Sequence, residues 1–211
     1  MMRFLLLLAL AATSGCNYLA WPAYVLAPPP PMKTVAPEFG QLPGKSVAIL
    51  IYADLDTLME YPRVQAELTD AVSADLCRNV KGVQVVESRR VLRYQDENPR
   101  WDTTPPERLC ASFNCDYVLL ISIQQFSTRE PGSLHLARGS LLADAKLYQS
   151  VVPNVQQGGC AWRGEPIRVL YPPDSPLGVL AGDDWPIRIE TYKAFADRLA
   201  RKFYQHKVPV E

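Results

Sequence analysis

The sequence DYVLLISIQQF, residues 116–126, is the strongest strand signal in the chain and decides the fold. Its first half, 117–121, is apolar without a break, whereas Ser122 and Gln124 interrupt the second half. A continuous apolar run is typical of a strand covered on both faces, and polar interruptions are typical of a strand with one wet face. We therefore expect a strand that starts in the centre of a sheet and emerges from it at its end.

Strand signals also lie on either side of this stretch. The sequence EPGS at 130–133 is a turn by composition, and apolar residues then alternate with polar ones through 134–148. This pattern predicts a long antiparallel partner with one wet face, in which Gly139 marks a bulge. The run VAILIY at 47–52 predicts a central strand that is covered on both faces, and 83–86 and 160–163 predict short strands.

Helix signals alternate with these strands. Thr57 and Glu60 have the spacing of a capping box, and apolar residues then recur every four positions, so one helix is predicted up to about Val80. Further helices are predicted at 88–94, at 107–113 and, with a clear apolar stripe, at 190–204. The proline-rich stretch 166–186 reads as a loop. The predicted class is α/β, with a single mixed sheet of about four to five strands and helices packed on it, in one domain over 46–206.

The N-terminus has the order of a secretory signal. Arg3 precedes a short apolar run, and Thr13-Ser14-Gly15-Cys16 resembles the lipobox of bacterial lipoproteins. The resemblance implies that residues 1–15 are a signal peptide and that Cys16 carries lipid and anchors the chain in a membrane of the cell envelope. Asn17, by the same resemblance, favours the periplasmic face of the outer membrane. The alternative is ordinary signal cleavage nearby, which would leave Cys16 as a free thiol.

The two ends of the mature chain are expected to lie outside the domain. Residues 16–45 contain many prolines, which lack a backbone N–H and fix φ, so they read as a lipidated tether and not as part of a helix or a central strand. Residues 207–211 read as a C-terminal tail.

Charge and cysteine content limit the function classes. The chain has 22 basic and 22 acidic residues, so no field of one sign is available to bind nucleic acid. Four cysteines follow Cys16, and export would allow disulfides. Cys110 and Cys115 are the closest pair in sequence and are the first candidates. The alternatives are small buried thiols and, less favoured because of the spacing and the two histidines, a zinc site.

Catalytic signals are weak throughout the sequence. No nucleophile elbow, zinc-protease, phosphate-loop or dinucleotide-binding motif occurs, and we expect both histidines at the surface. We predict no catalytic residue, no metal and no cofactor. Asp54 and Asp56 follow the first strand, where α/β sheets often hold ligands, and are weak ligand candidates against a reading as solvated loop carboxylates. Asp116 is expected to hydrogen-bond to the turn before its strand.

The order of these segments resembles a known group of envelope domains. The phrases SVAIL at 46–50 and CDYVL at 115–119, the strand at 139–148 and the terminal helix look like the periplasmic α/β domain of the curli-secretion lipoprotein, the penicillin-binding-protein activator lipoproteins and the N-terminal domain of the Tol-Pal protein B. A curli-type pore is not expected, because 166–186 lacks alternating strands of about 9 to 11 residues. The resemblance implies a tethered docking domain.

Two functions of different classes remain open from the sequence. The first is a non-enzymatic, membrane-anchored lipoprotein whose domain docks an envelope protein, through a sheet edge or through 165–186. The second is a small-molecule or metal-binding enzyme domain that uses Asp54 and Asp56. The sequence does not identify the partner.

Overall fold

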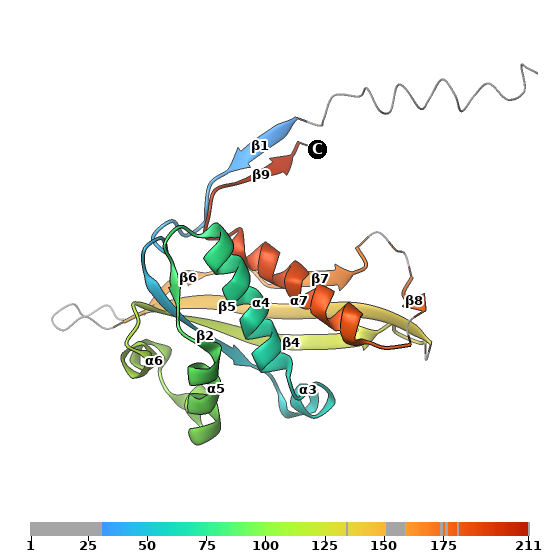
Figure 1. Ribbon diagram of the computed structural model, residues 1–211, viewed down its shortest axis with the longest axis horizontal. Helices are drawn as coiled ribbons and strands as arrows, with labels where there is room; N and C mark the ends of the chain where they lie inside the picture. Colours follow the sequence, from blue (N-terminus) through green and yellow to red (C-terminus); the bar gives the residue numbers. More distant parts are fainter. Residues whose placement is uncertain are drawn as a thin grey trace, which may run out of the picture. The chain divides into compact units, whose positions relative to one another are not determined.

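The computed structural model describes residues 31–133, 135–150, 159–173, 175, 177–180 and 182–210 (Figure 1). The predicted signal peptide and Cys16 therefore lie outside the described residues. The chain divides into two units, of which the larger is Ala36–His206. The smaller contains β1 (Met32–Val35) and most of β9 (His206–Pro209), which pair in a two-stranded sheet of their own.

The larger unit is built on one mixed sheet with the strand order β3-β2-β4-β5-β6, and β7 and β8 also pair with β5. β3 and β4 run parallel to β2, whereas β5 is antiparallel to β4 and to the strands on its other side. The strands are β2 (Ser46–Tyr52), β3 (Gln84–Val85), β4 (Tyr117–Arg129), β5 (Leu136–Gln149), β6 (Cys160–Arg163), β7 (Ile167–Tyr171) and β8 (Val179–Leu180). The predicted α/β class with a single mixed sheet is confirmed.

β2 separates two hydrophobic cores. Ile49 and Ile51 point into the larger core, whereas Ala48 and Leu50 point into the smaller one, and all four are fully buried. β2 pairs with β4 from Val47↔Tyr117 onward. The prediction of a strand covered on both faces is therefore correct.

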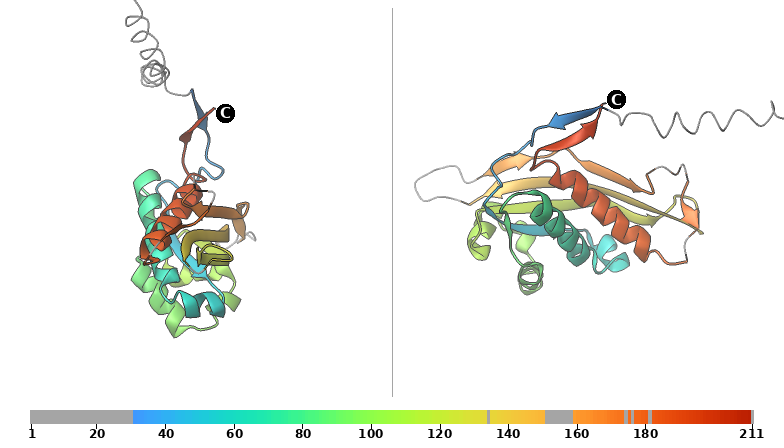
Figure 2. Two further views of the ribbon diagram at one scale, coloured as in Figure 1. Left: turned by 90° about the vertical axis from the view of Figure 1, so that its right-hand side faces the viewer. Right: turned by 45° about the horizontal axis from the view of Figure 1, so that its top comes forward.

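Helices cover both faces of the sheet. α4 (Val64–Asn79) and α7 (Trp185–Ala200) lie side by side over the larger core (Figures 1 and 2). α5 (Ser88–Glu97), the short 3-10 helix η1 (Trp101–Thr103) and α6 (Pro106–Phe113) enclose the smaller core. Among the described residues, no helix has the length and apolar content needed to cross a membrane.

α7 packs closely on a bulge in β5. Between the pairs Ser127↔Ser140 and Arg129↔Ala137, two residues of β5 face one residue of β4, so the bulge predicted at Gly139 is present. A Cβ atom on Gly139 would lie 1.7 Å from Thr191 Oγ1 and 2.9 Å from Thr191 Cβ. The close packing of α7 on the sheet therefore requires glycine at this position.

The starts of the two parallel strands are joined by a reciprocal pair of side chains. Asp116 Oδ2 accepts hydrogen bonds from Ser46 N at 2.9 Å and from Ser46 Oγ at 2.8 Å, and Asp116 N donates to Ser46 Oγ at 2.9 Å. These hydrogen bonds, together with nearby Lys45, hold the pKa of Asp116 below its usual range. The expected bond to the turn before β4 is wrong, because Asp116 bonds to the neighbouring strand.

The first predicted helix is two helices in the structure. α3 (Leu55–Glu60) is capped by Asp54, not by the predicted Thr57 and Glu60 box, and α4 begins only at Val64. Tyr61 separates them with φ −128° and ψ 72°. The physical reason is Pro62, since the residue before a proline is disfavoured in the α conformation.

The predicted loop at 166–186 contains two strands. In β7, Ile167 and Val169 are buried in the larger core and alternate with more exposed residues. Pro166 and Pro172 flank this strand and do not interrupt it, so the proline content was misleading. The last helix, predicted from Glu190, begins earlier, at Trp185, with Pro186 in its first turn.

Packing at the ends of the chain also differs from the predicted boundaries. Phe39 and Leu42, within the predicted tether, are buried in the larger core, and the amides of Glu38 and Phe39 donate to Lys202 O at 2.8 and 3.1 Å. The packed unit therefore begins before Ser46. The predicted tail contributes most of β9, which pairs with β1.

Candidate functional site

The predicted ligand carboxylates lie where α3 begins. Asp54 Oδ1 accepts a hydrogen bond from Thr57 N at 2.8 Å, and hydrogen bonds from the side chain and backbone of Thr57 hold the pKa of Asp54 below its usual range. Asp56 lies in the first turn, where a negative charge interacts favourably with the helix dipole. Asp54 thus has a structural role as a helix cap. Ligand binding by Asp54 and Asp56 stays a prediction.

The described part of the chain offers no clustered metal ligands. No group of three or more His, Cys, Asp or Glu side chains is placed to hold a metal ion among these residues. His135 is exposed, and His206 Nδ1 lies 3.2 Å from Tyr204 O in a half-buried position.

Two buried thiols lie close together at the C-terminal end of α6. Cys110 and Cys115 are both buried free thiols, and Asn114 turns the chain between them at φ 52°. A hydrogen bond with the Cys115 thiol and burial raise the pKa of Cys110 above its usual range, which favours its thiol form. The disulfide between them stays a prediction, which mass mapping without reductant tests.

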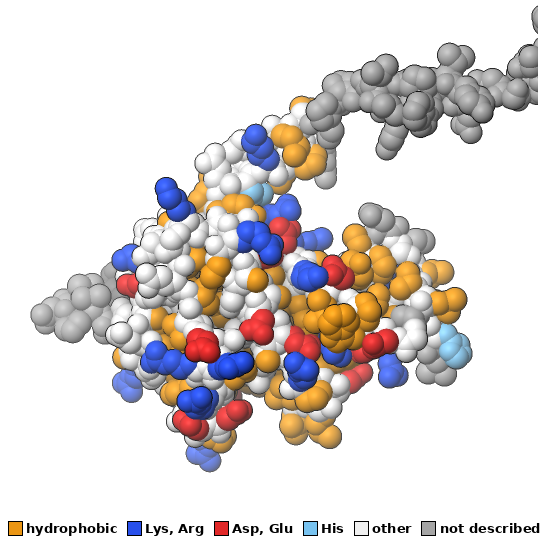
Figure 3. Space-filling view, viewed as in Figure 1, with side chains coloured by type: hydrophobic (Ala, Val, Ile, Leu, Met, Phe, Trp, Pro, Cys, Tyr) orange, Lys and Arg blue, Asp and Glu red, His pale blue; other side chains and the backbone are white. Residues whose placement is uncertain are grey.

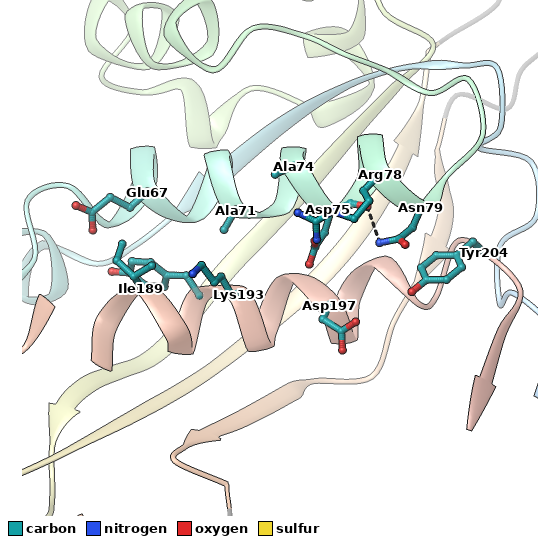
Figure 4. Close-up of a pocket in the computed structure, with 11 residues that line it drawn as sticks. Glu67, Ala71, Ala74, Asp75, Arg78, Asn79, Ile189, Lys193, Asp197 and Tyr204 are labelled. Atoms are coloured by element: carbon teal, nitrogen blue, oxygen red, sulfur yellow. Dashed lines mark hydrogen bonds and ion pairs between the residues drawn. The ribbon is translucent and has the colours of Figure 1, made fainter. Parts of the chain in front are cut away.

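A groove of about 510 Å³ runs between α4 and α7 (Figure 4). Ala71 and Ala74 of α4 make one wall shallow, and Ile189 adds apolar surface from α7. The polar lining is Glu67, Asp75, Arg78, Asn79, Tyr192, Lys193, Asp197 and Tyr204. The groove therefore combines a small-residue wall with a mixed-charge rim.

The charges along this groove are paired within the protein. Asp75 Oδ1 lies 2.6 Å from Arg78 Nη1, and Asp197 Oδ2 lies 2.8 Å from Arg201 Nη2. Glu67 Oε2 lies 3.0 Å from Arg188 Nε, and Lys193 Nζ lies 2.7 Å from Glu190 Oε1. A charged ligand would have to compete with these pairs, so the groove is poorly suited to bind one by charge.

Burial affects two groups in this groove. Burial raises the pKa of Asp75, and nearby Arg78 opposes that shift while Asp197 adds to it. Tyr192 is fully buried, burial raises its pKa above the usual range, and its hydroxyl has no hydrogen-bond partner among the described residues. An unpaired buried hydroxyl costs about 1 to 3 kcal/mol, so this position is the weak point of the α4–α7 packing.

Large apolar side chains are exposed on α3, β8 and the first turn of α7, which lie at the end of the sheet where β4 leads into β5. Between 53% and 82% of each residue is exposed. We call this surface the apolar end patch; its residues are Leu55, Met59, Leu177, Leu180 and Trp185. Figures 1 and 2 show α3, β8 and the first turn of α7 at the same end of the larger unit but spaced apart, and Figure 3 shows separate groups of hydrophobic side chains over these elements.

A second cavity, of about 490 Å³, lies where β4, β5 and β7 leave part of the sheet without a helix. Phe126 and Leu170 contribute apolar atoms, and Arg129 and Arg168 contribute charge. Arg138, in the same cavity, is 3.3 Å from Glu130 and donates to Ser175 O at 3.2 Å. These bonds tie the loop before β8 to the sheet.

Sequence reasoning found part of the apolar end patch. Three of its residues, Leu177, Leu180 and Trp185, fall in the stretch 165–186 that was predicted as a docking surface. The exposure of Leu55 and Met59 was not predicted, because the sequence analysis expects one helix up to about Val80 and not the separate helix α3. The available signal was their spacing of four residues next to acidic neighbours, which places both on one face of a short helix.

Comparisons with known proteins give distant likenesses only. No protein-family model matches the sequence, and no curated protein matches it. The chain is distantly similar in structure to bacterial lipoproteins and to PelC, so the particular group predicted from the sequence stays a prediction.

Three solved structures illustrate this likeness. The lipoprotein GNA1162 from Neisseria meningitidis is 18% identical, over 59% of this chain and 78% of that chain, with a TM-score of 0.41. The PelC dodecamer from Paraburkholderia phytofirmans is 11% identical over 83% and 99%, with a TM-score of 0.45. A minor lipoprotein from Acinetobacter baumannii is 12% identical over 75% and 88%, with a TM-score of 0.30. At these scores the matches assign no function to this chain.

Proposed function

We propose that this chain is a non-enzymatic lipoprotein of the bacterial cell envelope that docks a protein partner. Acylated Cys16 anchors it at the periplasmic face of the outer membrane, and the apolar end patch forms the docking surface. The exposure of this patch carries the proposal.

The physical reason is the cost of leaving such side chains in water. Fully burying one Leu, Met or Phe side chain contributes about 1.5 to 3 kcal/mol, so covering five large apolar side chains provides a strong driving force for association. Exposed apolar residues scattered singly need no explanation, but a group at one end of a domain is typical of an interaction site. Trp185 is also of the residue type that most often dominates binding energy at interfaces.

The sheet edge, predicted as another docking surface, supports the proposal less well. On β7, the carbonyl of Arg168 already accepts a hydrogen bond of 2.6 Å from Arg198 Nη1 of α7. A partner strand that paired with β7 would have to displace this bond. The apolar end patch requires no such rearrangement.

Anchoring is tested at the mature N-terminus. Mass spectrometry is expected to find Cys16 as the first residue with an acyl mass, and a Cys16→Ser variant is expected to appear in the soluble fraction. A mature chain that begins elsewhere and carries no lipid would contradict the anchoring proposal.

Docking is tested by photo-crosslinking in living cells. A photoreactive benzoylphenylalanine in place of Leu180 is expected to give one reproducible crosslinked complex with an envelope protein. The same residue in place of Arg89, exposed on α5, is the matched control and is expected to give none. Equal patterns from both positions, or no crosslink from Leu180, would contradict a docking role for the patch.

A further inference from the structure

Carboxylates lie beside the α3 and α7 parts of the apolar end patch. Asp54, Asp56 and Glu60 belong to α3 and its cap, and Asp183, two residues before α7, accepts a hydrogen bond of 2.9 Å from Trp185 N. All four are exposed, and none of them has an ion pair among the described residues. We call these four residues the acidic rim.

A chain of buried hydroxyls holds the two parts of this surface together. Tyr61 Oη donates to Glu60 Oε1 at 3.1 Å and accepts from Thr128 N at 3.1 Å. Thr128 Oγ1 in turn donates to Asp184 Oδ2 at 3.1 Å, at the start of α7. Tyr61 and Thr128 are almost completely buried, so they link the end of α3 to the start of α7.

The cations at this end do not neutralise the rim. Arg188 lies 3.0 Å from Glu67 and 3.5 Å from Asp184, and Arg63 lies 3.6 Å from Glu67. Arg129, exposed at the end of β4, is one positive charge against the four carboxylates of the rim. The surface around the apolar side chains is therefore negative overall.

We infer that the apolar end patch and its acidic rim recognise a basic amphipathic segment of a protein, whose apolar side covers Leu55, Met59 and Trp185 and whose Lys or Arg residues meet the four carboxylates. This inference rests on the proposed docking function and adds the chemistry of the partner. Opposite charges around an apolar centre steer association and reject partners of like charge.

The same charges disfavour the two other occupants. A second copy that used this patch in a two-fold interface would place one acidic rim against the other. An anionic membrane surface would also repel the rim, since such surfaces attract basic segments.

The inference is tested with two helical peptides of about 18 residues, or five turns. Both carry Leu along one face, and the other face carries Lys in the first peptide and Glu in the second. Binding to the purified full-length mature chain with Cys16→Ser is measured by fluorescence anisotropy without detergent. We expect the Lys peptide to bind, with an affinity that falls as salt rises, and the Glu peptide not to bind.

A chain with an altered acidic rim locates the binding. The triple variant Asp56→Lys/Glu60→Gln/Asp183→Asn keeps the cap Asp54 and the side-chain oxygens that accept from Tyr61 Oη and Trp185 N, and it is expected to bind the Lys peptide about tenfold more weakly. The matched variant Asp96→Lys/Glu97→Gln/Asp102→Asn makes the same charge change at exposed positions of α5 and η1 and is expected to bind like the wild type. Equal affinities of the two variants, or equal binding of both peptides, would overturn the inference.

Crosslinking from Leu180 in cells separates this inference from the proposed function. The wild-type complex is expected to be lost in the rim variant and kept in the matched variant. A complex that persists in the rim variant, or crosslinks to lipid or to a second copy, would overturn the basic-partner inference while the patch remained a docking surface. No crosslink in the wild type would overturn the proposed function and the inference with it.

Discussion

The helix α7 takes part in two regions of opposite character. Along its middle it packs beside α4, where carboxylates and cations pair with one another inside the protein. At its first turn, Trp185 is exposed, and Asp183, two residues before it, has no ion pair among the described residues, although Asp184 lies 3.5 Å from Arg188. In the first region the charged side chains form ion pairs with one another, whereas in the second Trp185 stays exposed to water and Asp183 has no ion pair among the described residues. Substitutions in the first should change stability, and substitutions in the second should change association.

The largest effect is expected where α7 sits on the sheet. Gly139→Ala would place a Cβ atom 1.7 Å from Thr191 Oγ1, so α7 must move away from β5. We expect a loss of about 3 kcal/mol in the free energy of unfolding, measured by urea denaturation. The matched test is Gly139→Ala combined with Thr191→Ala, which removes the nearest atom and should recover part of the loss. Additive losses would show that Thr191 is not the cause.

A smaller and opposite effect is expected in the groove between α4 and α7. Tyr192→Phe removes a buried hydroxyl without a partner among the described residues and keeps the ring, so the free energy of unfolding should rise by about 1 kcal/mol. Thermal and urea unfolding measure the change. A decrease would mean that the hydroxyl is bonded in solution, for example to an ordered water.

The next effect depends on pH and concerns Asp75. Because burial raises its folded pKa above the ordinary value of 3.8, the folded state binds this proton more tightly than the unfolded chain does. Its contribution to stability is therefore fully present below pH 3.8 and is lost as the pH rises through the folded pKa. The stability of the wild type relative to Asp75→Asn should increase as the pH falls from neutral toward that range. A difference that is constant with pH, or that slopes the other way, would show that Arg78 outweighs burial.

The smallest effect on stability is expected at the apolar end patch. The variant Leu55→Ser/Met59→Ser changes two exposed side chains, so the free energy of unfolding should stay within about 0.5 kcal/mol of the wild type. Crosslinking from Leu180 should nevertheless be lost. A large loss of stability in this variant would mean that Leu55 and Met59 contribute to the folded core. The two regions would then not differ in their effect on stability.

Local sequence patterns predicted the elements well and their limits less well. The alternation in β5, the unbroken apolar run in β2 and the bulge at Gly139 are local signals, and all three are present in the structure. The prediction of a loop at 166–186 is wrong, because Pro166 and Pro172 flank β7 and do not interrupt it. The predicted tether extends too far along the chain, because Phe39 and Leu42 are buried in the larger core. These two residues belong to no periodic apolar pattern, so the sequence does not indicate their burial.

The sequence indicates the residues of the candidate surface but not that they lie at the same end of the domain. The acidic and apolar residues of α3 lie in one short stretch, and Asp183 and Trp185 lie more than a hundred positions later. Their proximity depends on the path of β4 and on hydroxyls of Tyr61 and Thr128, neither of which has a sequence signature.

The sequence by itself determined the α/β class, the central strands and the amphipathic helices, because each depends on the periodicity of neighbouring residues along one segment. It also contains the predicted signal peptide and Cys16, on which the anchoring proposal depends. Only the tertiary structure decided which charges are paired, which buried hydroxyl has no hydrogen-bond partner among the described residues and which apolar side chains stay in water. Burial and pairing depend on residues that are distant in the chain and meet only once the sheet and its helices are packed.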